Sequence, residues 1–135
     1  MTIYEQLRRD EGVKAVLYRD ELGNPTIGVG HNLAVPLSDG AIQKILEDDV
    51  HMARETLTTR LPWVTTMSDA RQGAFVNLTF NLGIDGLLGF SRLLRAAQSG
   101  AWEAAAQELL ASRYAKQVGA RAERLATQIR EDRWI

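Results

Sequence analysis

The stretch that decides the fold is Glu11-Gly12-Val13-Lys14-Ala15-Val16-Leu17-Tyr18-Arg19-Asp20-Glu21-Leu22-Gly23-Asn24-Pro25-Thr26-Ile27-Gly28-Val29-Gly30-His31. Apolar residues alternate with other residues on both sides of Gly23-Asn24-Pro25, a pattern typical of two strands joined by a turn. We therefore predict a small hairpin or three-stranded sheet here, and no other β-structure in the chain. A sheet of this size is marginal alone and must pack on another element.

A short helix precedes this sheet. Thr2 and Glu5 have the spacing of a capping box, in which a hydroxyl and a carboxylate satisfy backbone N–H groups at a helix start. Gly12 is typical of the residue that follows a helix. The pattern therefore places Glu11 on the last helical turn, directly before the first strand.

The rest of the chain has helical spacing of its apolar residues. Ser38-Asp39 predicts the start of a long helix that ends near Pro62, and Ser68 predicts the start of another that Gly83 stops. Residues 84–89 read as a glycine-broken connection, and further helices are predicted over 91–99, 101–112 and 121–132.

We therefore predict an α+β, mainly α, two-lobed fold within a single domain, 1–135. Its small antiparallel sheet lobe covers about 13–40, its connecting helix about 38–60, and its helical lobe about 61–135 together with the N-terminal helix 3–11.

Composition narrows the class of protein. The net charge of -1 gives no global field for nucleic acid or an anionic membrane, so we expect neither partner. The absence of cysteine leaves no disulfide and no thiolate metal site, and no histidine–carboxylate grouping has metal-ligand spacing, so we expect no metal and no cofactor. No stretch reads as a signal peptide or as a membrane span, and we expect no stable membrane insertion.

Glu11 and Asp20 are the candidate chemical pair. Two carboxylates that face one cleft suffice for glycosidic hydrolysis, one as acid and one as base. With seventeen acidic residues in the chain, the alternative is two solvated surface carboxylates. Thr26 alone is an ordinary strand residue, and the nearby glycines are equally compatible with turns and bulges. The occurrence of both carboxylates, the threonine and the glycines within about twenty residues around one turn favours an active site.

The chain resembles the phage-type (T-even) lysozymes, endolysins of glycoside hydrolase family twenty-four. The resemblance runs over essentially the whole sequence. It is carried by Asp10-Glu11-Gly12, Tyr18-Arg19-Asp20, Thr26-Ile27-Gly28-Val29-Gly30-His31, Phe80-Asn81-Leu82-Gly83, Gly89-Phe90, Ala101-Trp102-Glu103-Ala104-Ala105, Ser112-Arg113-Tyr114, Arg121-Ala122-Glu123-Arg124 and Trp134.

The resemblance implies a muramidase that hydrolyses the β-1,4 bond between N-acetylmuramic acid and N-acetylglucosamine in peptidoglycan. It implies that Glu11 is the general acid, that Asp20 positions or activates the attacking water, and that Thr26 holds that water. The family inverts the anomeric centre, so we expect the two carboxyl groups roughly 6.5–9.5 Å apart.

Four further residues take roles from the same resemblance. Phe80 corresponds to an aromatic residue that packs against substrate, with a core phenylalanine as the alternative. Arg121 falls where the family has an arginine that pairs with the catalytic glutamate. His31 and Asp49 align with a buried structural pair that supports the site.

The sequence also departs from the family pattern. Residues 32–37 pass almost directly into the connecting helix, so the small lobe is shorter and part of one cleft wall is missing. Two sugar-contact positions of the family become Leu93 and Glu108, and we carry neither role over.

Expected partners follow from the resemblance: peptidoglycan glycan strands as substrate, a holin for release, and action as a monomer. We expect the protein in the host bacterial cytoplasm until lysis, then in the periplasm and cell wall. The alternatives are a lytic transglycosylase on the same fold, a non-catalytic wall-binding module, or an effector domain of a longer protein.

Overall fold

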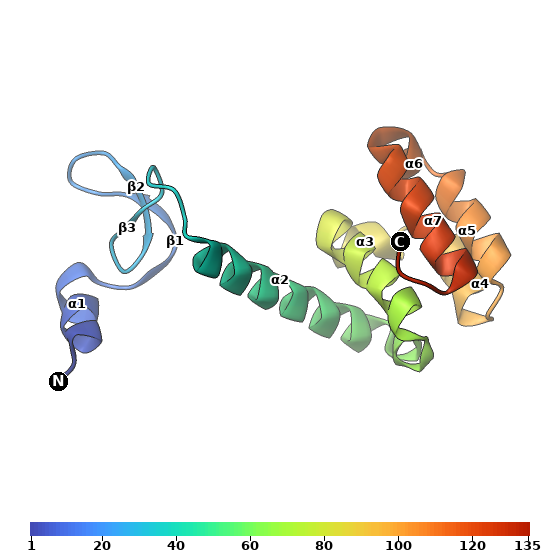
Figure 1. The fold of residues 1–135 in the computed structure, drawn as a ribbon, viewed down its shortest axis with the longest axis horizontal. Coiled ribbons are helices and arrows are strands. Elements are labelled where there is room, and N and C mark those ends of the chain that lie inside the picture. The colour runs from blue at the N-terminus through green and yellow to red at the C-terminus, as the bar shows by residue number, and fades with distance from the viewer. The chain divides into compact units, whose positions relative to one another are not determined.

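The computed structural model describes residues 1–135 and is mainly helical, with one three-stranded antiparallel sheet, which confirms the predicted fold class (Figure 1). The elements are α1 (Ile3–Glu11), β1 (Lys14–Arg19), β2 (Pro25–Gly28), β3 (His31–Asn32), α2 (Asp39–Arg60), the 3-10 helix η1 (Pro62–Thr66), α3 (Asp69–Leu88), α4 (Ser91–Gln98), α5 (Trp102–Leu110), α6 (Arg113–Val118) and α7 (Ala120–Glu131).

The chain divides into two compact units, which we call the N-terminal unit (Met1–Ile45) and the C-terminal unit (Leu46–Ile135). The division falls inside α2. The assignment of helix 3–11 to the helical lobe, and the other lobe boundaries, stay predictions.

In the N-terminal unit, α1 begins with the predicted capping box. The Glu5 N–H donates to Thr2 Oγ1 at 3.2 Å, and the Thr2 N–H donates to Glu5 Oε2 at 2.6 Å. The helix ends at Glu11, where the Gly12 N–H donates to the Arg8 carbonyl at 3.0 Å. Glu11 therefore lies on the last turn, as predicted.

The sheet of this unit has the order β1-β2-β3, with both pairs antiparallel. Thr26 of β2 lies opposite Tyr18 of β1 on one side and opposite Asn32 of β3 on the other. An irregularity in register separates Lys14 from Tyr18 on β1. This central place in the sheet makes Thr26 only 3% exposed.

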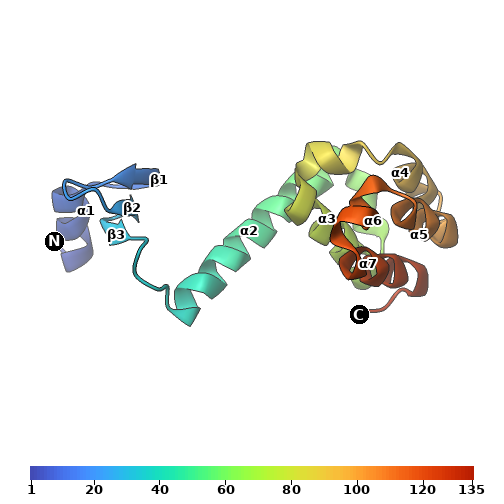
Figure 2. The ribbon, with the colours of Figure 1, turned by 90° about the horizontal axis from the view of Figure 1, so that it is seen from above.

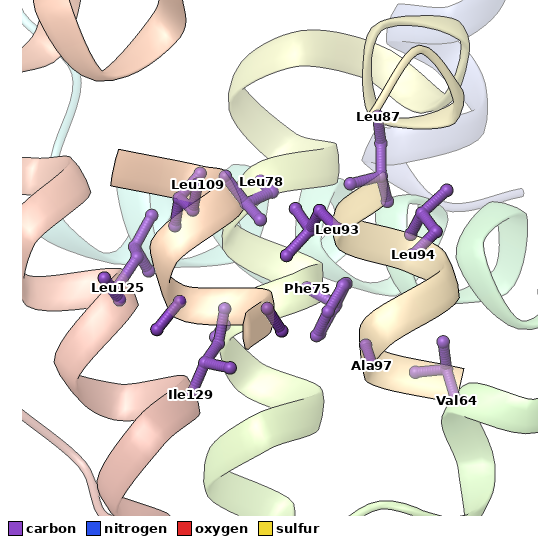
Figure 3. Close-up of a cluster of buried hydrophobic side chains, with 14 of the residues drawn as sticks. Val64, Phe75, Leu78, Leu87, Leu93, Leu94, Ala97, Leu109, Leu125 and Ile129 are labelled. Carbon is purple, nitrogen blue, oxygen red and sulfur yellow. The ribbon is translucent and has the colours of Figure 1, made fainter. Parts of the chain in front are cut away.

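The C-terminal unit has one buried hydrophobic cluster. Helix α5 packs against both α4 and α7, and α7 also packs against α3 and α6 (Figure 2). Figure 3 shows side chains from η1, α3, α4, α5 and α7 converging on this cluster, with Phe75 and Leu78 contributed by α3. Burial of such side chains stabilises the unit by roughly 1.5–3 kcal/mol each.

Arg71 connects two distant segments of this unit. Its guanidinium donates to the carbonyl oxygens of Ile129 at 2.7 Å and Arg130 at 3.2 Å, in the last turn of α7. It also forms an ion pair with Asp132 at 3.3 Å. Asp132 in turn accepts a hydrogen bond from Ser68, the residue that caps the start of α3. The start of α3 and the end of α7 are therefore joined.

Three predicted details need correction. Gly83 does interrupt α3, with φ of 73°, but helical structure resumes and continues to Leu88, so 84–89 is not merely a connection. The short helices α6 and η1 were not predicted. Both are too short to show a clear 3.6-residue repeat of apolar residues. Packing in the C-terminal unit, through Tyr114 of α6 and Val64 of η1, stabilises them instead.

Candidate active site

Glu11 lies against the turn between β2 and β3. A Cβ atom built on Gly30 would be 2.9 Å from Glu11 Oε2 and 3.1 Å from its Cδ, so any larger residue here would push this carboxyl group out of its position. Gly30 also has φ of 65°, in the left-handed region that favours glycine. The sequence therefore places the end of α1 directly on the sheet that carries Asp20 and Thr26.

Asp20 follows β1 and is held by the turn that leads to β2. Its Oδ1 accepts from the backbone N–H groups of Asn24 at 2.7 Å and Leu22 at 3.0 Å, and its Oδ2 accepts from the Asn24 side-chain amide at 3.1 Å. Backbone bonds between Asp20 and both Asn24 and Gly23 close the same turn. The carboxylate is thereby fixed in position by donors within four residues of it.

These donors also set the charge of Asp20. The backbone N–H of Asn24, followed by its side-chain amide and the N–H groups of Leu22 and Gly23, holds the pKa of Asp20 below its ordinary value. Hydrogen bonds to a carboxylate favour its charged form. Asp20 is therefore ionised at neutral pH, which suits a group that orients water or stabilises developing positive charge.

Thr26 lies next to this turn. Its hydroxyl donates to the carbonyl of Asn24 at 2.8 Å, so the O–H is used and the oxygen lone pairs stay available as acceptors. A hydroxyl oxygen in this state can accept a hydrogen bond from a water molecule. The arrangement thus offers one carboxyl group at a helix end, one ionised carboxylate and one water acceptor around a single small sheet.

Sequence reasoning missed the part played by Asn24. Its backbone N–H and its side-chain amide donate to the Asp20 carboxylate, and its carbonyl accepts a hydrogen bond from the Thr26 hydroxyl. The signal was present, because Asp and Asn commonly organise turns through bonds to backbone N–H groups a few residues away. The carboxyl separation predicted for Glu11 and Asp20 stays a prediction.

In the C-terminal unit, Arg121 donates to the side-chain oxygen of Asn77 from Nε at 3.1 Å and from Nη2 at 2.7 Å. Asn81 likewise accepts from the Tyr114 hydroxyl at 2.7 Å. Both asparagines of α3 therefore make defined hydrogen bonds. The predicted pairing of Arg121 with Glu11, and that of His31 with Asp49, stay predictions.

Phe80 is 47% exposed and is not part of the buried cluster of the C-terminal unit. It lines a pocket of about 350 Å³ together with Asn77, Arg121 and Trp134. The Trp134 indole lies against Gly73, at a place where any larger side chain would meet the ring. An exposed aromatic ring beside a guanidinium suits contact with a sugar, and the substrate role of Phe80 stays a prediction.

Another pocket, of about 520 Å³, lies between α4 and the end of α5. It includes Leu93 and Glu108, the two positions at which the sequence departs from the sugar contacts of the family, and also Arg92 and Arg95. The pocket therefore combines charges of both signs. No group of three histidine or acidic side chains could hold a metal ion, and no helix is long and apolar enough to cross a membrane.

Comparison with known proteins adds independent information. Residues 8–131 match the family model described as phage lysozyme. The chain is 30% identical over 154 aligned residues to the pre-baseplate central spike protein Gp5 of Enterobacteria phage T4, an alignment that covers 93% of this chain and 27% of that protein.

Two relatives from Dictyostelium discoideum match along nearly their whole length. The probable T4-type lysozyme 1 is 24% identical, with 95% of this chain and 93% of that protein covered. The probable T4-type lysozyme 2 is 25% identical, with 92% and 91% covered. The chain thus spans about a quarter of the length of the spike protein but nearly all of these two relatives.

Proposed function

Because the chain belongs to the phage lysozyme family and is thereby a lysozyme-type peptidoglycan hydrolase, we propose that it is a phage endolysin with an inverting muramidase activity. The bond that it hydrolyses in this proposal is the β-1,4 linkage between N-acetylmuramic acid and N-acetylglucosamine. The observation that carries the proposal is the gathering of Glu11, Asp20 and Thr26 around one three-stranded sheet.

In the proposed reaction, the Glu11 carboxyl group gives its proton to the glycosidic oxygen as the bond to the anomeric carbon breaks. A water molecule held by Thr26 and Asp20 attacks that carbon from the opposite face, and its proton passes to the Asp20 carboxylate. The lowered pKa of Asp20 keeps this group charged, at the cost of making it a weaker base. Asp20 then contributes chiefly by orienting the water and stabilising positive charge on the sugar ring.

The endolysin role extends the proposal to the cell. The enzyme would stay in the host cytoplasm until a holin opens the membrane, and would then act on the wall as a monomer to cause lysis. The family membership supports this role.

A second candidate is a wall-cleaving domain of a phage spike protein. The observation that favours it is the 30% identity to the central spike protein over 93% of this chain. Both candidates require the same chemistry at Glu11, Asp20 and Thr26, so cleavage must be tested first.

The test is clearing of purified Gram-negative sacculi, with the soluble products analysed by mass and by the anomer first released. The wild type should clear the sacculi and release reducing muramic acid ends with an inverted anomeric centre. Glu11→Gln should slow clearing by about 100-fold to 10,000-fold, the usual contribution of a general acid. Glu21→Gln is the matched control, because Glu21 is an exposed carboxylate one residue beyond Asp20, and it should clear normally.

Other results would reject the proposal in distinct ways. Anhydro ends would show a lytic transglycosylase. Retained anomeric configuration would refute the inverting step. A folded wild type that binds sacculi without clearing them would show a wall-binding module.

A further inference from the structure

A pocket of about 290 Å³ in the C-terminal unit lies outside the candidate active site and has a composition of its own. One wall is η1 and the residues after it, with Trp63 and Thr66. The other wall is the turn from α4 to α5, with Gln98, Ser99 and Trp102. No charged side chain lines it, unlike the pocket of about 520 Å³ between α4 and α5.

Both tryptophans of this pocket are held in place. Trp63 meets the buried ring of Phe75 edge to face, at 6.4 Å between centroids and 75° between planes. The Arg71 guanidinium lies over the Trp102 ring at 4.1 Å from its centroid. Because Arg71 is itself bound to the end of α7, the Trp102 indole is supported from behind. Each indole is half-buried, so part of its surface is open.

Each wall has a hydrogen bond of its own, and the two walls share a buried core. The Thr66 hydroxyl donates to the Trp63 carbonyl at 2.7 Å, and the Ser99 hydroxyl donates to the Ala96 carbonyl at 3.0 Å. Below the pocket, Val64 and Ala97, one from each wall, belong to the same buried cluster (Figure 3). The pocket is therefore preformed and would lose little entropy on binding.

The polar groups of the pocket can still bind a ligand. The hydroxyls of Thr66 and Ser99 each use their hydrogen, so their oxygens are free to accept. The exposed Gln98 side-chain amide lines the pocket and offers both donors and an acceptor. The pocket therefore offers these polar groups, together with the open faces of two indole rings, to a single small ligand.

We propose that this pocket, bounded by Trp63, Trp102 and Gln98, binds one neutral pyranose ring. A pyranose has C–H groups on its faces, which pack on the negative face of an aromatic ring, and hydroxyls on its edge, which pair with amides and hydroxyls. Ligand pockets span roughly 300–1,000 Å³. A volume of about 290 Å³ is at the small end of that range, so one ring would occupy the pocket and the rest of a strand would lie outside it.

The absence of charged side chains from the pocket lining indicates which sugar of peptidoglycan the pocket binds. This inference rests on the proposed function. In peptidoglycan, N-acetylmuramic acid carries a lactyl group with an acidic peptide, whereas N-acetylglucosamine is neutral. A pocket without cationic side chains favours the neutral sugar. The structure thus assigns to this pocket an N-acetylglucosamine ring of a glycan strand, as an anchor separate from the cleavage site.

The test follows the tryptophan indole N–H signals by NMR in the full chain carrying Glu11→Gln, in which the proposed cleavage is strongly slowed. Titration with N,N'-diacetylchitobiose should shift the Trp63 and Trp102 signals together and saturably. Absence of a shift at either indole would overturn the proposal. Glucuronic acid, a charged pyranose, should bind at least several-fold more weakly, and equal binding would overturn the preference for a neutral ring.

Two variants in the same Glu11→Gln background locate the binding. Gln98→Ala should weaken it about 3-fold to 10-fold by removing one or two hydrogen bonds. Gln117→Ala, which removes an exposed glutamine of α6, is the matched control and should leave the titration unchanged. An unchanged affinity in Gln98→Ala, at an unchanged melting temperature, would refute the assigned pocket.

Failure here is separable from failure of the proposed function. Cleavage of sacculi by the wild type with no indole shifts would reject only the anchor pocket. Indole shifts in a chain whose wild type never cleaves would reject only the muramidase.

Discussion

In the N-terminal unit, Asp20 and Thr26 are held by hydrogen bonds between residues two to four positions apart. In the C-terminal unit, Tyr114 reaches Asn81 across 33 positions, and Arg71 reaches Ile129 across 58. The candidate chemistry therefore depends on the geometry of one turn, whereas the larger unit depends on packing between distant segments. Changes in the two units should consequently affect different observables.

The largest effect is expected from the core of the C-terminal unit. Phe75→Ala removes a fully buried ring that also supports Trp63, and should lower the free energy of unfolding by about 3–5 kcal/mol. Chemical denaturation of the wild type and the variant measures this loss. The pKa of Asp20, followed by NMR in the folded fraction, should not change, and a change there would break the separation of the two units.

Gly30→Ala should have the next largest effect, and on activity more than on stability. The new Cβ would lie 2.9 Å from Glu11 Oε2 and would displace the carboxyl group. A misplacement of about 1 Å can cost on the order of 100-fold in rate. Clearing of sacculi per folded molecule measures the loss.

Gly28→Ala is the matched control for this variant. Gly28 has φ of 67°, close to the 65° of Gly30, but a Cβ there meets nothing within 4 Å. Both variants bear the same backbone strain, of about 1–2 kcal/mol. Equal loss of clearing in the two would show that strain, and not displacement of Glu11, is responsible.

Asn24→Ala should cause a moderate change in pH dependence. It removes the side-chain donor to Asp20 Oδ2 but keeps the backbone N–H that contributes most to lowering the Asp20 pKa. The pKa of Asp20 should rise part of the way toward that of an ordinary aspartate. The acid limb of the pH–activity profile should then move to higher pH, and an unmoved limb would contradict the role of Asn24.

The sign of the linked stability effect follows from the same shift. A carboxyl group whose pKa is lower when folded contributes stability above its unfolded pKa. That contribution is lost as the pH falls through the lower folded value. In Asn24→Ala the contribution should be smaller and should be lost at a higher pH than in the wild type.

The smallest effect is expected at Glu103. The Gln107 side chain and then the Arg130 guanidinium lower its pKa, and the Arg130 contact is 2.5 Å long. Glu103 is exposed, and exposed ion pairs contribute little. Glu103→Gln should lower the melting temperature slightly at neutral pH. The difference should vanish as the pH falls through the folded pKa of Glu103, and a difference that persists in acid would refute this origin.

The same contrast explains what the sequence could predict. The capping box of Thr2 and Glu5, the end of α1 at Glu11, and the sheet around Thr26 all follow from local patterns, and the structure confirms them. The Asp20 turn has its own local signal in Asn24. In these segments the residues that decide the structure lie close together in the chain.

Long-range packing sets the limit of such prediction. Helix α3 resumes beyond Gly83, and α6 forms, because these segments are buried against other helices. Neither segment has a strong helical pattern alone. The contact of Arg121 with Asn77 joins residues 44 positions apart, and no local signal predicts it. The exposed position of Phe80 likewise depends on which segments surround it.

The hydrogen bond from Arg71 to the last turn of α7 joins residues 58 positions apart and so closes a non-covalent ring. Joining the ends of so long a segment costs chain entropy, which must be lost before the guanidinium gains its carbonyl partners. A hairpin, by contrast, forms in about 1–10 μs. During synthesis, the turn at Asp20 can therefore fold before the residues of α7 that bind Arg71 have left the ribosome. The turn that holds Asp20 then forms first, and the contacts of Arg71 with α7 form later.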